Sequence, residues 1–171
     1  GVERGSIGVE KDCCTISTFE KLQKVLPNIQ FKDASDIFCF ARAVKEPDEI
    51  QLIRESIAIG EAAMQVAMDT AKPGISEMEV QRAAEIEMRR RGGIREVETM
   101  CQSGIRTANY RAFAAEWNKI EENDLVTVDL GCVYKGYGCD ITRTWVVGKS
   151  TQEQKKIAAD LYKTHEKVLA F

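Results

Sequence analysis

Two apolar, β-branched runs near residues 124–131 and 137–147 constrain the fold of this chain more than any other feature. Runs of this composition predict strands. They flank the turn-like sequence Tyr134-Lys-Gly-Tyr137, so we expect an antiparallel hairpin. One aspartate lies in each run, Asp129 in the first and Asp140 in the second. The hairpin therefore brings two carboxylates into the same part of the fold.

The position of the turn decides how these carboxylates face each other. A turn centred on Tyr134-Lys135 places Asp129 directly opposite Asp140, whereas one centred on Lys135-Gly136 makes them diagonal neighbours on the same face. A loop with an odd number of residues sends them to opposite faces. Like charges on one face are destabilising, and a hard divalent cation removes that penalty. The residues alone leave two interpretations open, a metal site or an exposed hairpin with two hydrated acids.

The hairpin also carries a longer motif: Asp129-Leu-Gly, then Tyr134-Lys-Gly-Tyr137, then Asp140-Ile-Thr-Arg-Thr144. This motif resembles the dinuclear metal motif of the pita-bread metallopeptidases, a family that includes methionine aminopeptidase, prolidase, aminopeptidase P and creatinase. It is most similar to the prolidase and aminopeptidase P branch. The resemblance implies that Asp129 chelates one divalent ion and that Asp140 bridges two, which are Mn, Co or Zn ions. It also implies cleavage of a peptide or small amide by metal-activated water.

The remaining sequence predicts an α+β fold with an antiparallel sheet and helices packed on one face. We expect helices over residues 47–71, 77–91 and from about 152 onward, with a capping box at Ser76-Glu-Met-Glu79, and a strand over 96–102. Earlier in the chain we expect a strand at 6–10, a helix at 15–26 and a strand at 30–32. Residues 37–44 fit either a strand or a helix. This order resembles the first half of a pita-bread catalytic domain over residues 46–171, with residues 1–45 as the tail of an N-terminal domain.

The resemblance also shows what these 171 residues do not contain. The family's metal site adds a histidine and two glutamates from the second half of the domain. The single histidine here, His165, is expected on a helix surface instead. Two carboxylates leave most of a coordination shell to water, so we expect weak metal binding and no catalysis by this chain alone. We expect the chain to be part of a longer protein; the alternatives are a second chain that supplies the other half and a degenerate remnant.

A second departure from the family lies in the segment from Ser103 to Arg111, which we expect to be a loop. The family has an asparagine and a histidine where this sequence has Arg106 and Arg111. Arginine binds carboxylates through two parallel hydrogen bonds and does not shuttle protons at neutral pH. We therefore predict Arg111, Arg106 and Tyr110 as substrate-binding residues. The alternative is that both arginines are surface residues on a loop that aligns differently.

These departures define two competing functions. The first is a catalytically inactive pita-bread module that binds a peptide or protein partner, which the missing histidine favours. The second is a lyase or amidinohydrolase that acts on a small carboxylate-bearing substrate, which the two loop arginines favour. The intact aspartates favour the metallopeptidase interpretation over the first alternative.

The composition excludes other classes of function. The net charge of −3 gives no support for binding nucleic acid or an anionic membrane. None of the six cysteines forms a Cys-x-x-Cys pair, which argues against structural zinc and for a reduced, cytoplasmic protein. Cys39, Cys101, Cys132 and Cys139 are predicted to be buried. Because related proteins of this branch are often dimers, a homodimer is one expected assembly.

Overall fold

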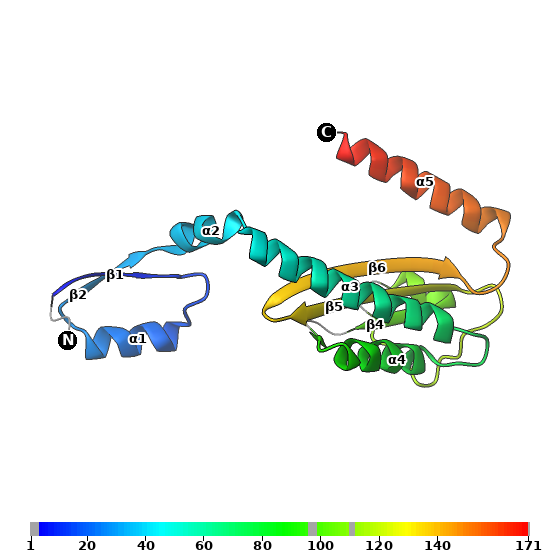
Figure 1. Ribbon diagram of the computed structural model, residues 1–171, viewed down its shortest axis with the longest axis horizontal. Coiled ribbons are helices and arrows are strands. Elements are labelled where there is room, and N and C mark those ends of the chain that lie inside the picture. Colours follow the sequence, from blue (N-terminus) through cyan, green and yellow to red (C-terminus); the bar gives the residue numbers. More distant parts are fainter. Residues whose placement is uncertain (1–3, 96–98, 110–111, 171) are drawn as a thin grey trace. The chain divides into compact units, whose positions relative to one another are not determined.

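The computed structural model describes residues 4–95, 99–109 and 112–170, which fall into two compact units, residues 1–47 and 48–171. In the first unit, strands β1 (Gly5–Val9) and β2 (Ile29–Asp33) pair in parallel, and helix α1 (Ile16–Val25) connects them (Figure 1). The stretch that fitted either a strand or a helix is helix α2 (Ser35–Ala43). Cys39 lies on α2 and is exposed, so the prediction that it is buried was wrong. Its neighbours Phe38 and Phe40 are also exposed, because this amphipathic helix buries little of its apolar face within the described residues of the unit.

The second unit contains the hairpin and the helices predicted beside it. Its elements are helix α3 (Pro47–Thr70), helix α4 (Glu77–Arg90), strands β3 (Ile94–Arg95) and β4 (Met100–Ser103), the 3₁₀ helix η1 (Gly104–Ala108), strands β5 (Leu125–Tyr134) and β6 (Tyr137–Val146), and helix α5 (Gln152–Leu169). The strand expected over 96–102 is described in part, as β4, and residues 96–98 lie outside the described residues. The loop expected from Ser103 includes the 3₁₀ helix η1.

The sheet is antiparallel and is built around β5. Strand β6 pairs with β5 along its whole length, while β3 and β4 share the other edge. Tyr134 pairs with Tyr137, so the hairpin loop is Lys135-Gly136. Both loop residues have positive φ, +49° and +91°, as a type I′ turn requires. This turn matches the right-handed twist of the strands and fixes the register of the whole hairpin.

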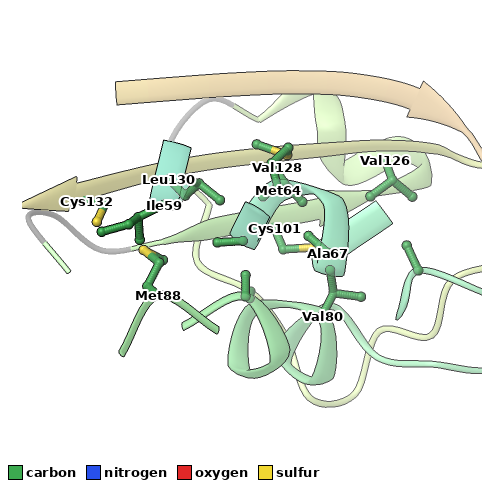
Figure 2. Close-up of a cluster of buried hydrophobic side chains, with 14 of the residues drawn as sticks. Ile59, Met64, Ala67, Val80, Met88, Cys101, Val126, Val128, Leu130 and Cys132 are labelled. Carbon is green, nitrogen blue, oxygen red and sulfur yellow. The ribbon is translucent and has the colours of Figure 1, made fainter. Parts of the chain in front are cut away.

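The core lies between one face of this sheet and helices α3 and α4 (Figure 2). Alternate residues of β5 point into it, and four of them are fully buried: Val126, Val128, Leu130 and Cys132. They pack against side chains from the two helices, namely Ile59, Met64 and Ala67 of α3 and Val80 and Met88 of α4. The hydroxyl of Ser56 on α3 also donates to the carbonyl oxygen of Cys132 at 2.8 Å. The intervening residues of β5, including Asp129, therefore point to the opposite face of the sheet.

The capping box predicted at the start of α4 is confirmed. The Ser76 hydroxyl accepts a hydrogen bond from the Glu79 N–H at 3.2 Å, and the Ser76 N–H donates to Glu79 Oε2 at 2.8 Å. These contacts end the loop after α3 at a defined residue. None of the described helices combines the length and the apolar character that a membrane-crossing helix needs.

The capping box makes stability depend on pH. The hydrogen bonds from Ser76, with a smaller contribution from Lys119, lower the pKa of Glu79 from 4.5 to about 2. The unfolded chain then takes up a proton at a higher pH than the folded protein does, so this stabilisation is present above about pH 4.5 and disappears as the pH falls toward 2. We expect Glu79→Gln to flatten the fall in Tm across this window, measured by circular dichroism. Glu61→Gln, at an exposed position of α3, should keep the wild-type slope; equal slopes for both variants would contradict the prediction.

Candidate metal site

Asp129 and Asp140, called the aspartate pair below, lie on the face of the hairpin away from the core. Asp129 pairs with Thr142, and Asp140 pairs with Gly131, so the two carboxylates are diagonal neighbours. The arrangement in which they are directly opposite is therefore wrong, because the turn is centred on Lys135-Gly136. The diagonal arrangement on one face is the alternative that the structure has. Gly131 has no side chain, which leaves space beside the Asp140 carboxylate.

Thr142 holds one of the carboxylates in place. Its hydroxyl donates to Asp129 Oδ1 at 2.6 Å, a short distance typical of a hydrogen bond to an ionised group. The neighbouring threonines, Thr127 and Thr144, instead bond each other at 3.0 Å between their hydroxyl oxygens. Asp129 is half-buried and Asp140 is exposed. One oxygen of Asp129 is thus fixed by the protein, and Asp140 is accessible from solvent.

A cavity of about 310 Å³ lies over the aspartate pair. Its lining comes from four elements, with Met100 and Gln102 from β4, Thr107 and Ala108 from η1, Thr127 and Asp129 from β5, and Asp140 and Thr142 from β6. The side-chain amide of Gln102 donates to the carbonyl oxygen of Ala112, which ties the loop beyond η1 to the sheet. The cavity has two carboxylates and several hydroxyl groups, so it suits a cation bound by oxygen ligands.

The chemistry of the donors fits divalent metal, but only in part. Carboxylate oxygens are suitable ligands for Mn and similar hard ions. Within residues 4–95, 99–109 and 112–170, no cluster of three or more His, Cys, Asp and Glu side chains is arranged to hold a metal ion. His165 is exposed on α5, with Nδ1 4.0 Å from Glu166, and does not line the cavity over the aspartate pair. Asp129 and Asp140 can therefore supply part of a coordination shell, and the rest must come from other donors.

Of the three predicted substrate-binding residues, Arg106 is the one that lies within the described residues. Arg106 lies in η1, where its Nε is 3.1 Å from both carboxylate oxygens of Glu77 and its guanidinium lies 4.9 Å from the centre of the Trp117 ring. These contacts give Arg106 a structural role, and binding of substrate by this residue stays a prediction. Arg111 and Tyr110 lie outside the described residues.

Glu77 is the residue of this region that the sequence did not reveal. An acidic residue in the first turn of a helix is ordinarily explained by the helix dipole, so nothing in the local pattern marks Glu77 as buried. In the fold it has no exposed surface, and its carboxylate accepts hydrogen bonds from Ser103, Ala115 and Asn118. The thiol of Cys101 is also buried, and burial raises its pKa to about 12. Cys101 is therefore an uncharged core residue, and the prediction that it is buried is confirmed.

Comparison with known proteins identifies relatives over nearly the whole chain. The model of metallopeptidase family M24 matches residues 51–171. The chain is 33% identical to an Xaa-Pro dipeptidase of Pyrococcus horikoshii over 89% of its own length and 43% of that protein. It is 32% identical to the uncharacterised peptidase YqhT of Bacillus subtilis over 92% of its length and 44% of that protein.

Solved structures of proteins with related activities also match this chain. An X-Pro aminopeptidase from Thermotoga maritima matches with a TM-score of 0.85 and 27% identity, covering 95% of this chain and 46% of that one. The predicted fold class, half of a pita-bread domain with an antiparallel sheet and helices packed against it, is confirmed. The chain spans less than half the length of the relatives named here.

Proposed function

Because the chain belongs to metallopeptidase family M24, we propose that it forms the first half of the catalytic domain of a metal-dependent Xaa-Pro peptidase. In this proposal residues 46–171 are that half-domain, and residues 1–45 are the end of an N-terminal domain. The observation that carries the proposal is the aspartate pair, which shares one face of the hairpin under a cavity of about 310 Å³. The remaining metal ligands come from sequence outside these 171 residues.

The two aspartates have distinct parts in this site. Asp129, held at Oδ1 by Thr142, keeps its other oxygen for a cation, and Asp140 is exposed beside Gly131 and can be shared between two ions. Bound Mn, Co or Zn ions would supply Lewis-acid polarisation of an amide carbonyl and activation of water. The chain itself orients the carboxylates and provides the wall of η1 against which a substrate lies.

The proposed substrate is a peptide with proline in the second position, because relatives with this specificity are found among both the sequence and the structure matches. Arg111 and Tyr110 are proposed to bind the substrate carboxylate or carbonyl, with Arg106 in a supporting position. A cytoplasmic location and a homodimer are also part of the proposal.

The test is hydrolysis by the purified protein that carries this chain. We expect release of proline from Xaa-Pro dipeptides in the presence of Mn²⁺, and no turnover of creatine-like amides in parallel assays. Turnover of the creatine-like compounds alone would replace the proposal with the amidinohydrolase alternative. The intact mass under denaturing conditions accompanies the assay: a value well above 19.1 kDa agrees with a longer protein that contains the other ligands.

The second candidate function is a catalytically inactive module that binds a peptide. It is favoured by the arginines at 106 and 111, where the family has an asparagine and a histidine. Binding of an Xaa-Pro peptide without hydrolysis, at any concentration of Mn²⁺, would decide for this candidate. The loop arginines would then be peptide ligands rather than part of a reactive site.

Thr142 offers a direct test of the metal site. We expect Thr142→Val to lower the affinity for Mn²⁺ by about 10- to 100-fold, since loss of a hydrogen bond to a ligating carboxylate has effects of this size. Isothermal titration of Mn²⁺ into each purified variant measures the change. Thr144→Val is the matched control, because the Thr144 hydroxyl bonds Thr127 and not a carboxylate. An equal loss in both variants would show that the hydrogen bond to Asp129 has no specific effect.

A further inference from the structure

Glu77 is a fully buried carboxylate that the proposed chemistry does not use. It lies in the first turn of α4 and accepts hydrogen bonds from four residues. The Ser103 N–H donates to Oε1 at 2.7 Å, and the Ala115 N–H donates to Oε2 at 2.9 Å. Arg106 Nε lies 3.1 Å from both oxygens, and Asn118 Nδ2 donates to Oε1 at 2.8 Å. Such a set of donors compensates the cost of burying a charge.

Only a carboxylate satisfies this arrangement. Each oxygen of Glu77 faces a backbone N–H, that of Ser103 on one side and that of Ala115 on the other. A glutamine in its place has one acceptor oxygen and one NH₂ group. In either orientation of the amide, the NH₂ group meets a backbone N–H, so one buried donor loses its partner. The site therefore requires an acceptor at both positions.

The donors come from both ends of one segment, residues 103–118. Ser103 immediately precedes η1 and Arg106 lies inside it, whereas Ala115 and Asn118 lie where the chain returns to α4. Asn118 Nδ2 also donates to the Ser103 hydroxyl at 2.8 Å, which joins the two ends. The Glu77 carboxylate thus binds both ends of the segment to the N-terminus of α4 through hydrogen bonds.

Within this segment, η1 forms part of the wall of the cavity over the aspartate pair. Thr107 and Ala108 of η1 line that cavity. The Thr107 hydroxyl donates to the carbonyl oxygen of Gly104 at 2.8 Å, so a side chain that lines the cavity is bonded to the first residue of η1. Glu77 holds this turn through Ser103 on one side and Arg106 within it. The buried carboxylate of Glu77 therefore fixes the position of η1 relative to the aspartate pair.

We propose that Glu77 is a positioning residue for the substrate site, acting through Ser103 and Arg106 on the η1 wall. It touches neither substrate nor metal. Its carboxylate determines how closely η1 approaches the aspartate pair, and so how tightly a peptide binds between them. The effect on substrate rests on the proposed function, whereas the effect on the position of η1 does not.

The test compares Glu77→Gln with Glu61→Gln, an exposed control, in the full protein that carries this chain. Hydrogen–deuterium exchange reports whether η1 is held, and we expect faster exchange at residues 103–108 in the Glu77 variant alone. Steady-state hydrolysis of an Xaa-Pro dipeptide reports the effect on the site. We expect KM to rise about tenfold with little change in kcat per folded enzyme, since loss of binding that is equal in the ground state and the transition state raises KM alone.

A purely stabilising role gives a different result. Loss of folded protein lowers the apparent kcat and leaves KM unchanged, and this outcome would overturn the inference. If Glu77→Gln does not fold, Asn118→Ala replaces it, because this change removes the Nδ2 group that donates to both Glu77 and the Ser103 hydroxyl and leaves the contacts of Arg106 and Ala115. The same rises in exchange at residues 103–108 and in KM are then expected, smaller in size. If the wild-type protein cleaves no Xaa-Pro peptide, the proposed function fails and exchange alone decides: unchanged exchange at residues 103–108 overturns the positioning role.

Discussion

Replacing Asp140 by asparagine in the protein that carries this chain should reduce hydrolysis of Xaa-Pro peptides by at least about 10³-fold, to the background of the assay. Asp140 is exposed, and its cross-strand partner is Gly131, so the substitution leaves the core untouched. Asparagine keeps the shape of the side chain and removes the negative charge that two shared cations need. The loss is therefore expected from chemistry and not from unfolding.

The measurement is steady-state turnover together with the amount of Mn²⁺ bound at equilibrium. Asp160→Asn is the matched control, because Asp160 is an exposed carboxylate on α5 that does not line the cavity. This control should keep wild-type turnover and wild-type metal content. Wild-type turnover in the Asp140 variant would refute the proposal that this aspartate holds metal.

The second large effect is expected in the core. Leu130 of β5 is fully buried and belongs to the core cluster drawn in Figure 2. We expect Leu130→Ala to lower the free energy of unfolding by about 2–5 kcal/mol, because the truncation removes buried apolar surface and leaves a cavity. The midpoint of urea unfolding, followed by tryptophan fluorescence, measures the change.

Val133→Ala on the same strand is its control. Val133 points to the opposite face of the sheet and is only half-buried. An alanine at this position therefore tests the effect of the substitution on the strand without the loss of core packing. We expect a clearly smaller loss for this variant. Similar losses for both substitutions would mean that strand propensity, and not the core, determines the effect at Leu130.

The hairpin shows how far local sequence can predict this fold. Its alternating apolar residues indicate two strands, and the capping box at Ser76 correctly predicts where α4 begins. The local sequence does not predict the register of the hairpin, because Tyr134-Lys135 and Lys135-Gly136 are both acceptable as turn centres. The positive φ angles of Lys135 and Gly136 select the second, and with it the diagonal arrangement of the aspartate pair.

By itself, the sequence determined that an antiparallel hairpin carries Asp129 on one strand and Asp140 on the other, since the strand pattern is a local property. The two-residue loop seen in the structure then placed both aspartates on one face. Only the tertiary structure decided that Glu77 is a buried anchor and that Arg106 turns inward to it. The two residues are separated by 29 positions, and their contact depends on how the 103–118 segment returns to the start of α4. The local sequence pattern does not predict this long-range contact. A charge can be buried only where distant segments supply hydrogen-bond donors to it.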